Sequence, residues 1–437
     1  MYQSLYKKKL TTPENAVGLI HRKCNIAFAM AVGQPPALLK ALADRARAGT
    51  FEQVDIYYMH AEAPANNTIL SEDILHILRP HPAFMGAKER ELAHSASGET
   101  RKVIFYEPNS FSQLPNYFRN YIPLDSFLVT VSPMDKAGFF TLGTNNDYSS
   151  TAARTCKNLI VEVNENMPRV FGESQIHVSE VAAIVENTVP LLSMAPRPPK
   201  PEDEIIGKQI ATLIPDGATV QFGVGGVPDA VCSYLKDRND MGIHSELLSP
   251  GMVDLVKQGN VTGVRKNINP RKHVFTLAFG DKDMYDFMDD NPSMESYPVD
   301  YVNNPTIIAK NDRVVSVNAI IEIDLFGQVN AEWLNHRQFG GPGGQNDFVR
   351  GAYMSKEGKS VSAFESTAAH GKVTKIVPQI SGVVTDLRSD TQYVVTEYGA
   401  VNLKGLSSSE RANQLIELAH PSFRDELKAA AKKMYLV

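Results

Sequence analysis

The chain has 437 residues, 43% of them hydrophobic, and a formal net charge of −5 with both signs interspersed. This length exceeds what one hydrophobic core usually supports, so two domains, or three, are expected. Because no basic stripe marks a nucleic-acid surface, we expect neither DNA nor RNA as a partner. No apolar run approaches the roughly 18 residues that span a bilayer, and the amino terminus lacks the apolar stretch of a signal peptide, which predicts a cytoplasmic protein without a membrane partner.

The three cysteines, Cys24, Cys156 and Cys232, are far apart and lie in apolar segments. They form neither a Cys-x-x-Cys pair nor a metal-binding spacing. We therefore expect reduced core thiols and no metal site.

The chain contains the same pattern twice. Residues 24–42 have the order strand, small-residue turn, helix, and residues 218–235 repeat it when Pro35 is aligned with Pro228. Two further pairings follow in chain order, the second looser than the first: 125–132 with 312–318, and 157–163 with 375–380. Three similarities in the same order indicate a duplicated α/β unit.

A proline-rich, charged segment lies between the repeats, as is typical of a semi-rigid linker. It runs from Met194 to Glu204, and we place the boundary there, giving domains 1–196 and 197–437. Strands that alternate with helices favour parallel pairing. The predicted fold is α/β, with two related layered domains and mainly parallel sheets.

The second repeat carries a glycine-rich turn, Gly-Val-Gly-Gly-Val-Pro-Asp at 223–229, where the first has Met30, Val32 and Gly33. Glycine lets a strand-to-helix turn approach a ligand, and the helix expected to start at Pro228 has free N–H groups that favour an anion. Such turns also serve tight helix packing, so this turn alone is unspecific. It also lacks the full dinucleotide fingerprint.

Glu246 follows Gly223 by 23 residues, which is one helix and one short connection later. We expect it at the end of the adjoining strand, just before a helix capped by Ser249 and started by Pro250. Ligands of open α/β sheets bind at this edge. Strand alternation puts His244 on the same face, where it either polarises the carboxylate or covers it.

A second glycine-rich loop, Gln338-Phe-Gly-Gly-Pro-Gly-Gly-Gln, leads into Asn-Asp-Phe-Val-Arg-Gly-Ala. Four glycines around a proline expose backbone N–H groups, which is the arrangement that holds an oxyanion or a phosphate. The segment after it is typical of a return to packed structure. We therefore interpret residues 340–344 as a functional loop.

Farther on, a strand ends in Glu397-Tyr398-Gly399, and its carboxylate is either a site residue or a core contact. Two helices are expected at the carboxyl end, one capped by Ser409 and one by Ser422, with Pro421 between them.

Together these stretches resemble the acetyl-CoA hydrolase/transferase family, most closely its 4-hydroxybutyrate CoA-transferase branch, over nearly the whole chain. The ordered set Gly-Val-Gly-Gly-x-Pro-Asp, His-x-Glu and Gly-Gly-x-Gly-Gly-x-x-Asp-Phe carries the resemblance. Segments that begin at Tyr106, Val131 and Ile176 also look like that family. The resemblance implies two related domains with a CoA site between them.

The resemblance also implies roles for single residues. Glu246 is by position the glutamate that carries CoA covalently, and Asn303 or Asn304 orients it. The supporting candidates are His244 and Glu397. The loop glycines Gly340, Gly341, Gly343 and Gly344 are candidates for an oxyanion site. Contacts to CoA are expected from Gly223, Val224, Gly225, Gly226, Val227 and Ile321, and from Gly344.

The implied reaction moves CoA from an acyl-CoA such as acetyl-CoA to a short-chain acid such as 4-hydroxybutyrate or butyrate. It passes through a glutamyl-CoA thioester, which is covalent catalysis without a permanently bound cofactor. CoA-transferases of this kind usually self-associate, so a dimer or larger homo-oligomer is expected.

Three alternatives stay open at this point. Water replaces the second acid in an acetyl-CoA hydrolase. A dicarboxylate such as succinate or itaconate is a different acceptor and requires a cation in the pocket. From another class, a non-catalytic nucleotide- or CoA-binding sensor uses the same glycine turns without turnover.

Overall fold

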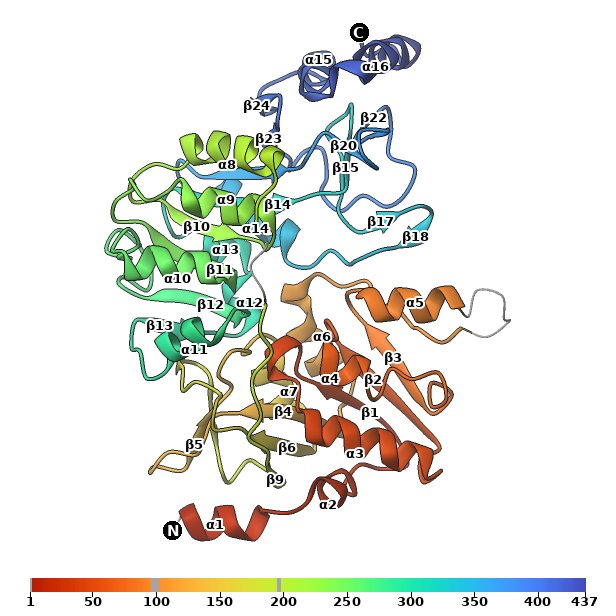
Figure 1. Ribbon diagram of the computed structural model, residues 1–437, viewed down its shortest axis with the longest axis vertical. Coiled ribbons are helices and arrows are strands. Elements are labelled where there is room, and N and C mark those ends of the chain that lie inside the picture. The colour runs from red at the N-terminus through yellow and green to blue at the C-terminus, as the bar shows by residue number, and fades with distance from the viewer. Residues whose placement is uncertain (1, 96–101, 195–197) are drawn as a thin grey trace. The chain divides into compact units, whose positions relative to one another are not determined.

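A computed structural model describes residues 2–95, 102–194 and 198–437. The chain forms two compact units (Figure 1). The N-terminal unit comprises Met1–Ala195 and Val274–Val302, and the C-terminal unit comprises Pro196–His273 and Asn303–Val437. Part of the expected linker, residues 195–197, lies outside the described residues, and the boundary at 197 stays a prediction.

The N-terminal unit is built on a parallel six-stranded sheet in the order β3-β2-β1-β4-β6-β9. Its strands are β1 (Lys23–Phe28), β2 (Gln53–Tyr58), β3 (Leu78–Pro82), β4 (Ser126–Val131), β6 (Asn158–Val163) and β9 (Ala183–Glu186). Its helices up to residue 155 are α1 (Tyr2–Lys9), α2 (Pro13–Val17), α3 (Pro36–Arg47), α4 (Ala63–Asn66), α5 (Ala87–Ser95), α6 (Leu114–Asn120) and α7 (Ser149–Thr155). The expected strand, turn and helix of residues 24–42 are thus confirmed as β1, the 3-10 turn Ala31–Gly33 and α3.

Residues 274–302 belong to the N-terminal unit although they follow the repeat by many positions. They contain most of β12 (His273–Ala278), then α11 (Lys282–Met288), β13 (Met294–Ser296) and α12 (Val299–Val302), and β13 pairs with β7 (Phe171–Gly172). A buried loop holds them, because the Asn146 side chain donates to the carbonyl of Ser296 at 2.9 Å and the backbone of Asp147 donates to Thr276 at 3.1 Å. The sequence pattern did not predict that residues 274–302 belong to the N-terminal unit.

The C-terminal unit contains six neighbouring strands of one sheet, in the order β24-β23-β19-β14-β10-β11. The strands are β10 (Thr219–Phe222), β11 (Gly242–Leu248), β14 (Val314–Ala319), β19 (Lys359–Ala363), β23 (Tyr393–Thr396) and β24 (Gly399–Asn402). All neighbours are parallel except β23 and β24, so the prediction of mainly parallel α/β sheets is confirmed.

Helices and small sheets complete this unit (Figure 1). The helices are α8 (Pro201–Leu213), α9 (Gly226–Ser233), α10 (Pro250–Lys257), α13 (Pro305–Ile308), α14 (Gln345–Met354), α15 (Ser408–Leu418) and α16 (Pro421–Lys433). A three-stranded sheet contains β15 (Glu322–Asp324), β16 (Val329–Asn330) and β22 (Ile376–Val377). Two hairpins are β17 (Trp333–Leu334) with β18 (Arg337–Gln338), and β20 (Thr367–Ala368) with β21 (Val373–Thr374).

The strand orders test the predicted duplication. β2-β1-β4-β6-β9 in the first unit corresponds to β11-β10-β14-β19-β23 in the second, which supports the first two pairings. The third pairing is wrong, because the counterpart of β6 is β19, whereas residues 375–380 contain β22 of the small sheet. Short apolar strands resemble one another in sequence, and only the order of the strands in the sheet shows which of them correspond.

The two carboxyl-terminal helices are confirmed, but their caps differ from the prediction. Ser407, rather than Ser409, caps α15 by accepting from Glu410 N, and the Glu410 carboxylate accepts from Ser407 N in return. The side chain of His420, rather than Ser422, caps α16. Because Ser407, Ser408 and Ser409 are adjacent, the sequence does not show which of them is the N-cap of α15.

Candidate functional site

Glu246 lies on β11, and Ser249 and Pro250 follow it as the N-cap position and first residue of α10, which confirms the predicted strand-to-helix order. The Ser249 side chain makes no capping hydrogen bond. β10 and β11 are parallel, with Val220 opposite Ile243. Their carboxyl ends therefore share one edge of the sheet, where ligands of α/β proteins bind. The glycine-rich turn after β10 and the carboxylate of Glu246 emerge at this edge.

Two donors contact the carboxylate of Glu246. The side-chain nitrogen of Asn303 donates to Oε2 at 2.5 Å, and the backbone N–H of Gly344 also donates to the carboxylate. Asn303 is fully buried just before α13, and Gly344 is the N-cap of α14. Three segments far apart in sequence thus meet at one carboxylate.

The surroundings of Glu246 favour its neutral form. The pKa of this carboxyl is raised from 4.5 to about 7, chiefly by burial, and the nearby Asp347 carboxylate contributes to the increase. The hydrogen bonds from Asn303 and Gly344 act in the opposite direction because they stabilise the anion. A carboxyl group poised near neutral pH, held by two N–H donors, is typical of a catalytic position.

The loop at 338–344 approaches Glu246 through its last glycine. A Cβ atom at Gly344 would lie 1.8 Å from Oε2 of Glu246 and 2.0 Å from Nδ2 of Asn303, so only glycine fits there. Gly343 has φ +55 and open space around it, and Gly344 is the glycine whose backbone donates to Glu246. Gly340 N donates instead to the carbonyl of Glu332 at 3.1 Å. Of the four predicted glycines, Gly344 is therefore the one placed to act on the carboxylate.

The turn at 223–227 is open to solvent. Gly225 has φ +120, which requires glycine, and a Cβ at Gly226 would lie 2.1 Å from Oδ2 of Asp203. Val224 is 48% exposed. Helix α9 begins at Gly226, two residues earlier than expected from Pro228, and Pro228 is its third residue. The backbone N–H groups of the turn thus start a helix at the sheet edge.

The remaining predicted residues have other surroundings. Buried His244 packs its ring 6.4 Å from that of Phe348 on α14. Asn304 caps α13 by accepting from Thr306 N at 2.9 Å, so Asn303 is the asparagine that contacts Glu246. Ile321 is partly exposed after β14, and its N–H donates to Asn330. Glu397 accepts from the backbone and hydroxyl of Ser366, at 2.9 and 2.5 Å, which is a structural contact.

Sequence reasoning missed a buried ring of polar side chains in the same sheet. The Ser316 hydroxyl donates to Oε1 of Gln221 at 2.6 Å, Nδ2 of Asn318 donates to Ser316 at 2.8 Å, and Nε2 of Gln221 donates to Oδ1 of Asn318 at 3.4 Å. The signal was present as polar residues at alternate positions of an otherwise apolar strand, Ser316-Val317-Asn318.

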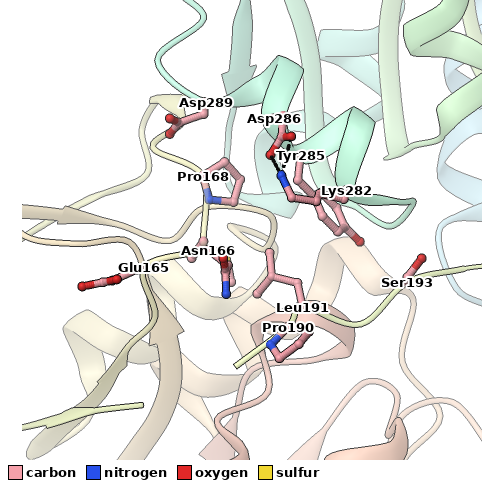
Figure 2. A pocket seen from close by; sticks show the side chains of 11 residues that line it. Glu165, Asn166, Pro168, Pro190, Leu191, Ser193, Lys282, Tyr285, Asp286 and Asp289 are labelled. Atoms are coloured by element: carbon pink, nitrogen blue, oxygen red, sulfur yellow. Dashed lines mark hydrogen bonds and ion pairs between the residues drawn. The ribbon is translucent and has the colours of Figure 1, made fainter. Parts of the chain in front are cut away.

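A separate cavity of about 610 Å³ lies within the N-terminal unit. Figure 2 shows its lining, where Lys282 pairs with Asp286 at 2.5 Å. The hydroxyl of Tyr285 also donates to the carbonyl of Leu192, at 2.9 Å. No predicted site residue is among those that line it. We therefore assign the candidate site to the sheet edge at Glu246.

The described part of the chain shows neither a metal cluster nor a membrane-spanning helix. Within it, no group of three or more His, Cys, Asp and Glu residues has the arrangement of a metal site. None of the helices in residues 2–95, 102–194 and 198–437 is both long and apolar enough to cross a bilayer.

Comparison with known proteins identifies the family of this chain. Residues 1–193 match the acetyl-CoA hydrolase/transferase N-terminal domain, and residues 280–431 match the C-terminal domain of the same family. A 4-hydroxybutyrate coenzyme A transferase of Clostridium kluyveri is 41% identical, with 99% of this chain and 100% of that protein covered.

Two solved structures are similar over the whole chain. RipA from Yersinia pestis is 51% identical, with a TM-score of 0.97 and 100% of both chains covered. A 4-hydroxybutyrate CoA-transferase from Porphyromonas gingivalis is 33% identical, with a TM-score of 0.85 and 99% of this chain and 100% of that chain covered.

Proposed function

The chain belongs to the acetyl-CoA hydrolase/transferase family, and on this premise we propose that it is a CoA-transferase that acts through a covalent glutamyl-CoA on Glu246. Its substrates are an acyl-CoA and a short-chain carboxylic acid such as 4-hydroxybutyrate or butyrate. Relatives named 4-hydroxybutyrate coenzyme A transferase and butyryl-CoA:acetate CoA-transferase, 41% and 37% identical, support this activity.

One observation carries the proposal: the Glu246 carboxylate receives N–H donors from Asn303 and Gly344 at the carboxyl edge of a parallel sheet. A carboxylate that served only packing would be costly at this position, because burial is the main cause that raises its pKa to about 7. The surrounding fold instead holds one carboxylate oxygen in place.

The reaction proceeds through two covalent intermediates. The ionised carboxylate of Glu246 attacks the thioester carbonyl, the C–S bond breaks, and an acyl-glutamyl anhydride and CoA thiolate result. The thiolate then attacks the glutamyl carbonyl, which releases the carboxylate of the first acid and leaves glutamyl-CoA. A second acid reverses both steps and leaves as its own CoA ester, so the free energy of the thioester is conserved without ATP.

The residues around Glu246 have defined roles in this scheme. In each attack on the glutamyl carbonyl an oxyanion develops on the glutamate, where Asn303 Nδ2 and the Gly344 N–H already donate. Loss of one such donor typically costs about 2.7 to 4 kcal/mol in the barrier. The open turn Gly223–Val227 and Ile321 would contact the CoA that arrives at the same edge. His244, two residues before Glu246 on the same strand, packs its ring near that of Phe348 on α14.

A competition assay tests the proposal and separates it from hydrolysis. The purified protein is incubated with acetyl-CoA and a panel of acids that includes butyrate, 4-hydroxybutyrate, succinate and itaconate, and both new acyl-CoA and free CoA are measured. We expect new acyl-CoA with a monocarboxylate or hydroxy acid, and little free CoA. Free CoA release that is independent of added acid would indicate a hydrolase, and tight CoA binding without either product would indicate a sensor.

A further inference from the structure

The ring formed by Gln221, Ser316 and Asn318 lies in the same strands as the glycine turn. Phe222 of β10 pairs with Val317 of β14, and the N–H of Gly223 donates to the Val317 carbonyl at 3.3 Å, so the next residues across are Gly223 and Asn318. The parallel ladder therefore continues to the first residue of the turn.

On its other side β10 neighbours β11, and the register between these two strands locates Glu246. Val220 and Ile243 form the last pair of this ladder, and continuing the count by three positions along each strand sets Gly223 beside Glu246. Because paired residues of parallel strands point to the same face, the side chains of Glu246 and Asn318 stand on one face with Gly223 between them.

Gly223 leaves the space between these two side chains open. A Cβ atom at Gly223 would meet no atom within 4 Å. Neighbouring strands are about 4.8 Å apart, so the Cα atoms of Glu246 and Asn318 are roughly 10 Å apart. A narrow, extended part of a substrate therefore fits over Gly223. The carboxylate of Glu246 lies on one side of it and the amide of Asn318 on the other.

The amide of Asn318 is held in a fixed orientation and keeps hydrogen-bonding capacity. It is 9% exposed, donates one N–H to Ser316 and accepts from Gln221. In the described ranges of the chain its second N–H and the second lone pair of Oδ1 have no partner. One donor and one acceptor side by side match a secondary amide of a ligand.

Resting on the proposed function, we propose that Asn318 binds the pantetheine amide nearest to the sulfur of CoA while that sulfur reacts at Glu246. Two methylene groups separate the sulfur from this amide, a reach of about 4 Å at ordinary bond lengths. With a hydrogen bond of about 2.9 Å added, this part of CoA reaches across the open space over Gly223, from the sulfur at Glu246 to the amide of Asn318. The ring from Gln221 and Ser316 keeps the Asn318 amide in place, so the contact requires little ordering when CoA binds.

Truncated donors test this contact, because they report on the amide alone. Acetyl-S-N-acetylcysteamine carries the amide, and the acetyl thioester of pentane-1-thiol has the same chain length without it. With propionate as acceptor, we expect the wild-type kcat/KM to favour the amide donor by roughly three- to tenfold, the value of one net hydrogen bond. Asn318→Leu should remove this preference.

Gln221→Leu is the matched control. It breaks the same buried ring and destabilises the same strands, but it leaves the Asn318 amide at the open space over Gly223, so most of the preference should persist. Asn318→Asp preserves the shape of the side chain and loses its N–H donors. If Asn318→Leu fails to fold, the preference for the amide donor is measured in this variant instead. We expect it to reduce the preference, because the donor to the ligand carbonyl is lost while the carboxylate still accepts from the ligand N–H.

The outcomes separate this proposal from the proposed function. A preference that is absent in the wild type, or undiminished in both Asn318 variants, overturns the Asn318 contact. Covalent CoA on Glu246 is measured in the same wild-type preparation by mass spectrometry after incubation with acetyl-CoA. Its presence alongside a failed donor test leaves the glutamyl-CoA mechanism standing, whereas its absence refutes that mechanism itself.

Discussion

The side-chain nitrogen of Asn303 donates a 2.5 Å hydrogen bond to Oε2 of Glu246, although 57 positions separate the two residues in the chain. Asn303 is fully buried, and its neighbour Asn304 points to the start of α13 instead. One asparagine of an adjacent pair thus acts on the carboxylate, and the other acts on a helix end. This division provides a matched pair of variants.

Replacing Asn303 by alanine should lower kcat/KM roughly 100-fold or more, because the oxyanion on Glu246 loses a preorganised donor. The same hydrogen bond lowers the pKa of the Glu246 carboxyl. We therefore also expect the midpoint of the pH–rate profile to move upward. Steady-state kinetics between pH 5 and 9 measure both effects.

Asn304→Ala is the control for that measurement. Loss of the N-cap of α13 should cost about 1 kcal/mol of stability and leave the pH midpoint in place. Equal losses of activity in the two variants, with no shift in either profile, would contradict the assignment of Asn303.

The wild-type enzyme should depend on pH through Glu246 itself. Its pKa is raised from 4.5 to about 7 by burial, and the ionised form is the nucleophile, so kcat/KM for acetyl-CoA should rise with pH and level off above about 7. A profile already flat at pH 5.5 would show that the carboxyl is not poised in this way.

Stability should vary with pH in the opposite sense at this residue. A carboxyl whose pKa is raised in the folded state binds its proton more tightly there, so its contribution to stability falls as the pH rises from 4.5 towards 7. Glu246→Gln removes this titration. The melting temperature of the variant relative to the wild type should therefore increase across that interval, which thermal unfolding at several pH values measures.

The last two glycines of the loop should differ in their tolerance of a methyl group. Gly344→Ala places a Cβ 1.8 Å from the Glu246 carboxylate and should abolish transfer. Gly343→Ala meets open space and costs only the strain of φ +55, of order 1 kcal/mol, so most activity should remain. Comparable activity in the two purified, folded variants would contradict the role of Gly344.

Glu397 should prove to be structural. Its carboxylate is already bonded to the backbone and hydroxyl of Ser366, so Glu397→Ala should reduce stability by about 1 to 3 kcal/mol, and the pH midpoint of activity should not change. Chemical denaturation and the pH–rate profile together check this. A shifted midpoint in Glu397→Ala would show instead that Glu397 is part of the active site.

The sequence predicted the features that depend on local pattern. Ser249 and Pro250 gave the start of α10, and hence the end of the strand that carries Glu246. The glycine-rich turn and loop were found because only glycine permits close backbone approach, as at Gly344. The family and the duplicated α/β fold followed from the order of these motifs.

What the sequence did not reveal depends on long-range pairing. The ring of Gln221, Ser316 and Asn318 joins two strands whose register is fixed only in the folded sheet. The choice between Asn303 and Asn304 depends on where α13 begins, and both asparagines suit an N-cap. The membership of residues 274–302 in the N-terminal unit rests on contacts to the buried loop at Asn146, which no local pattern encodes.

The central claim is that Glu246 carries CoA, and trapping the intermediate tests it most directly. The protein is incubated with acetyl-CoA in the absence of an acceptor, treated with borohydride or hydroxylamine, digested and analysed by mass spectrometry. We expect modification of the peptide that contains Glu246, by reduction to the alcohol or conversion to the hydroxamate, and none in Glu246→Gln. An unmodified Glu246 in a preparation that transfers CoA would contradict it.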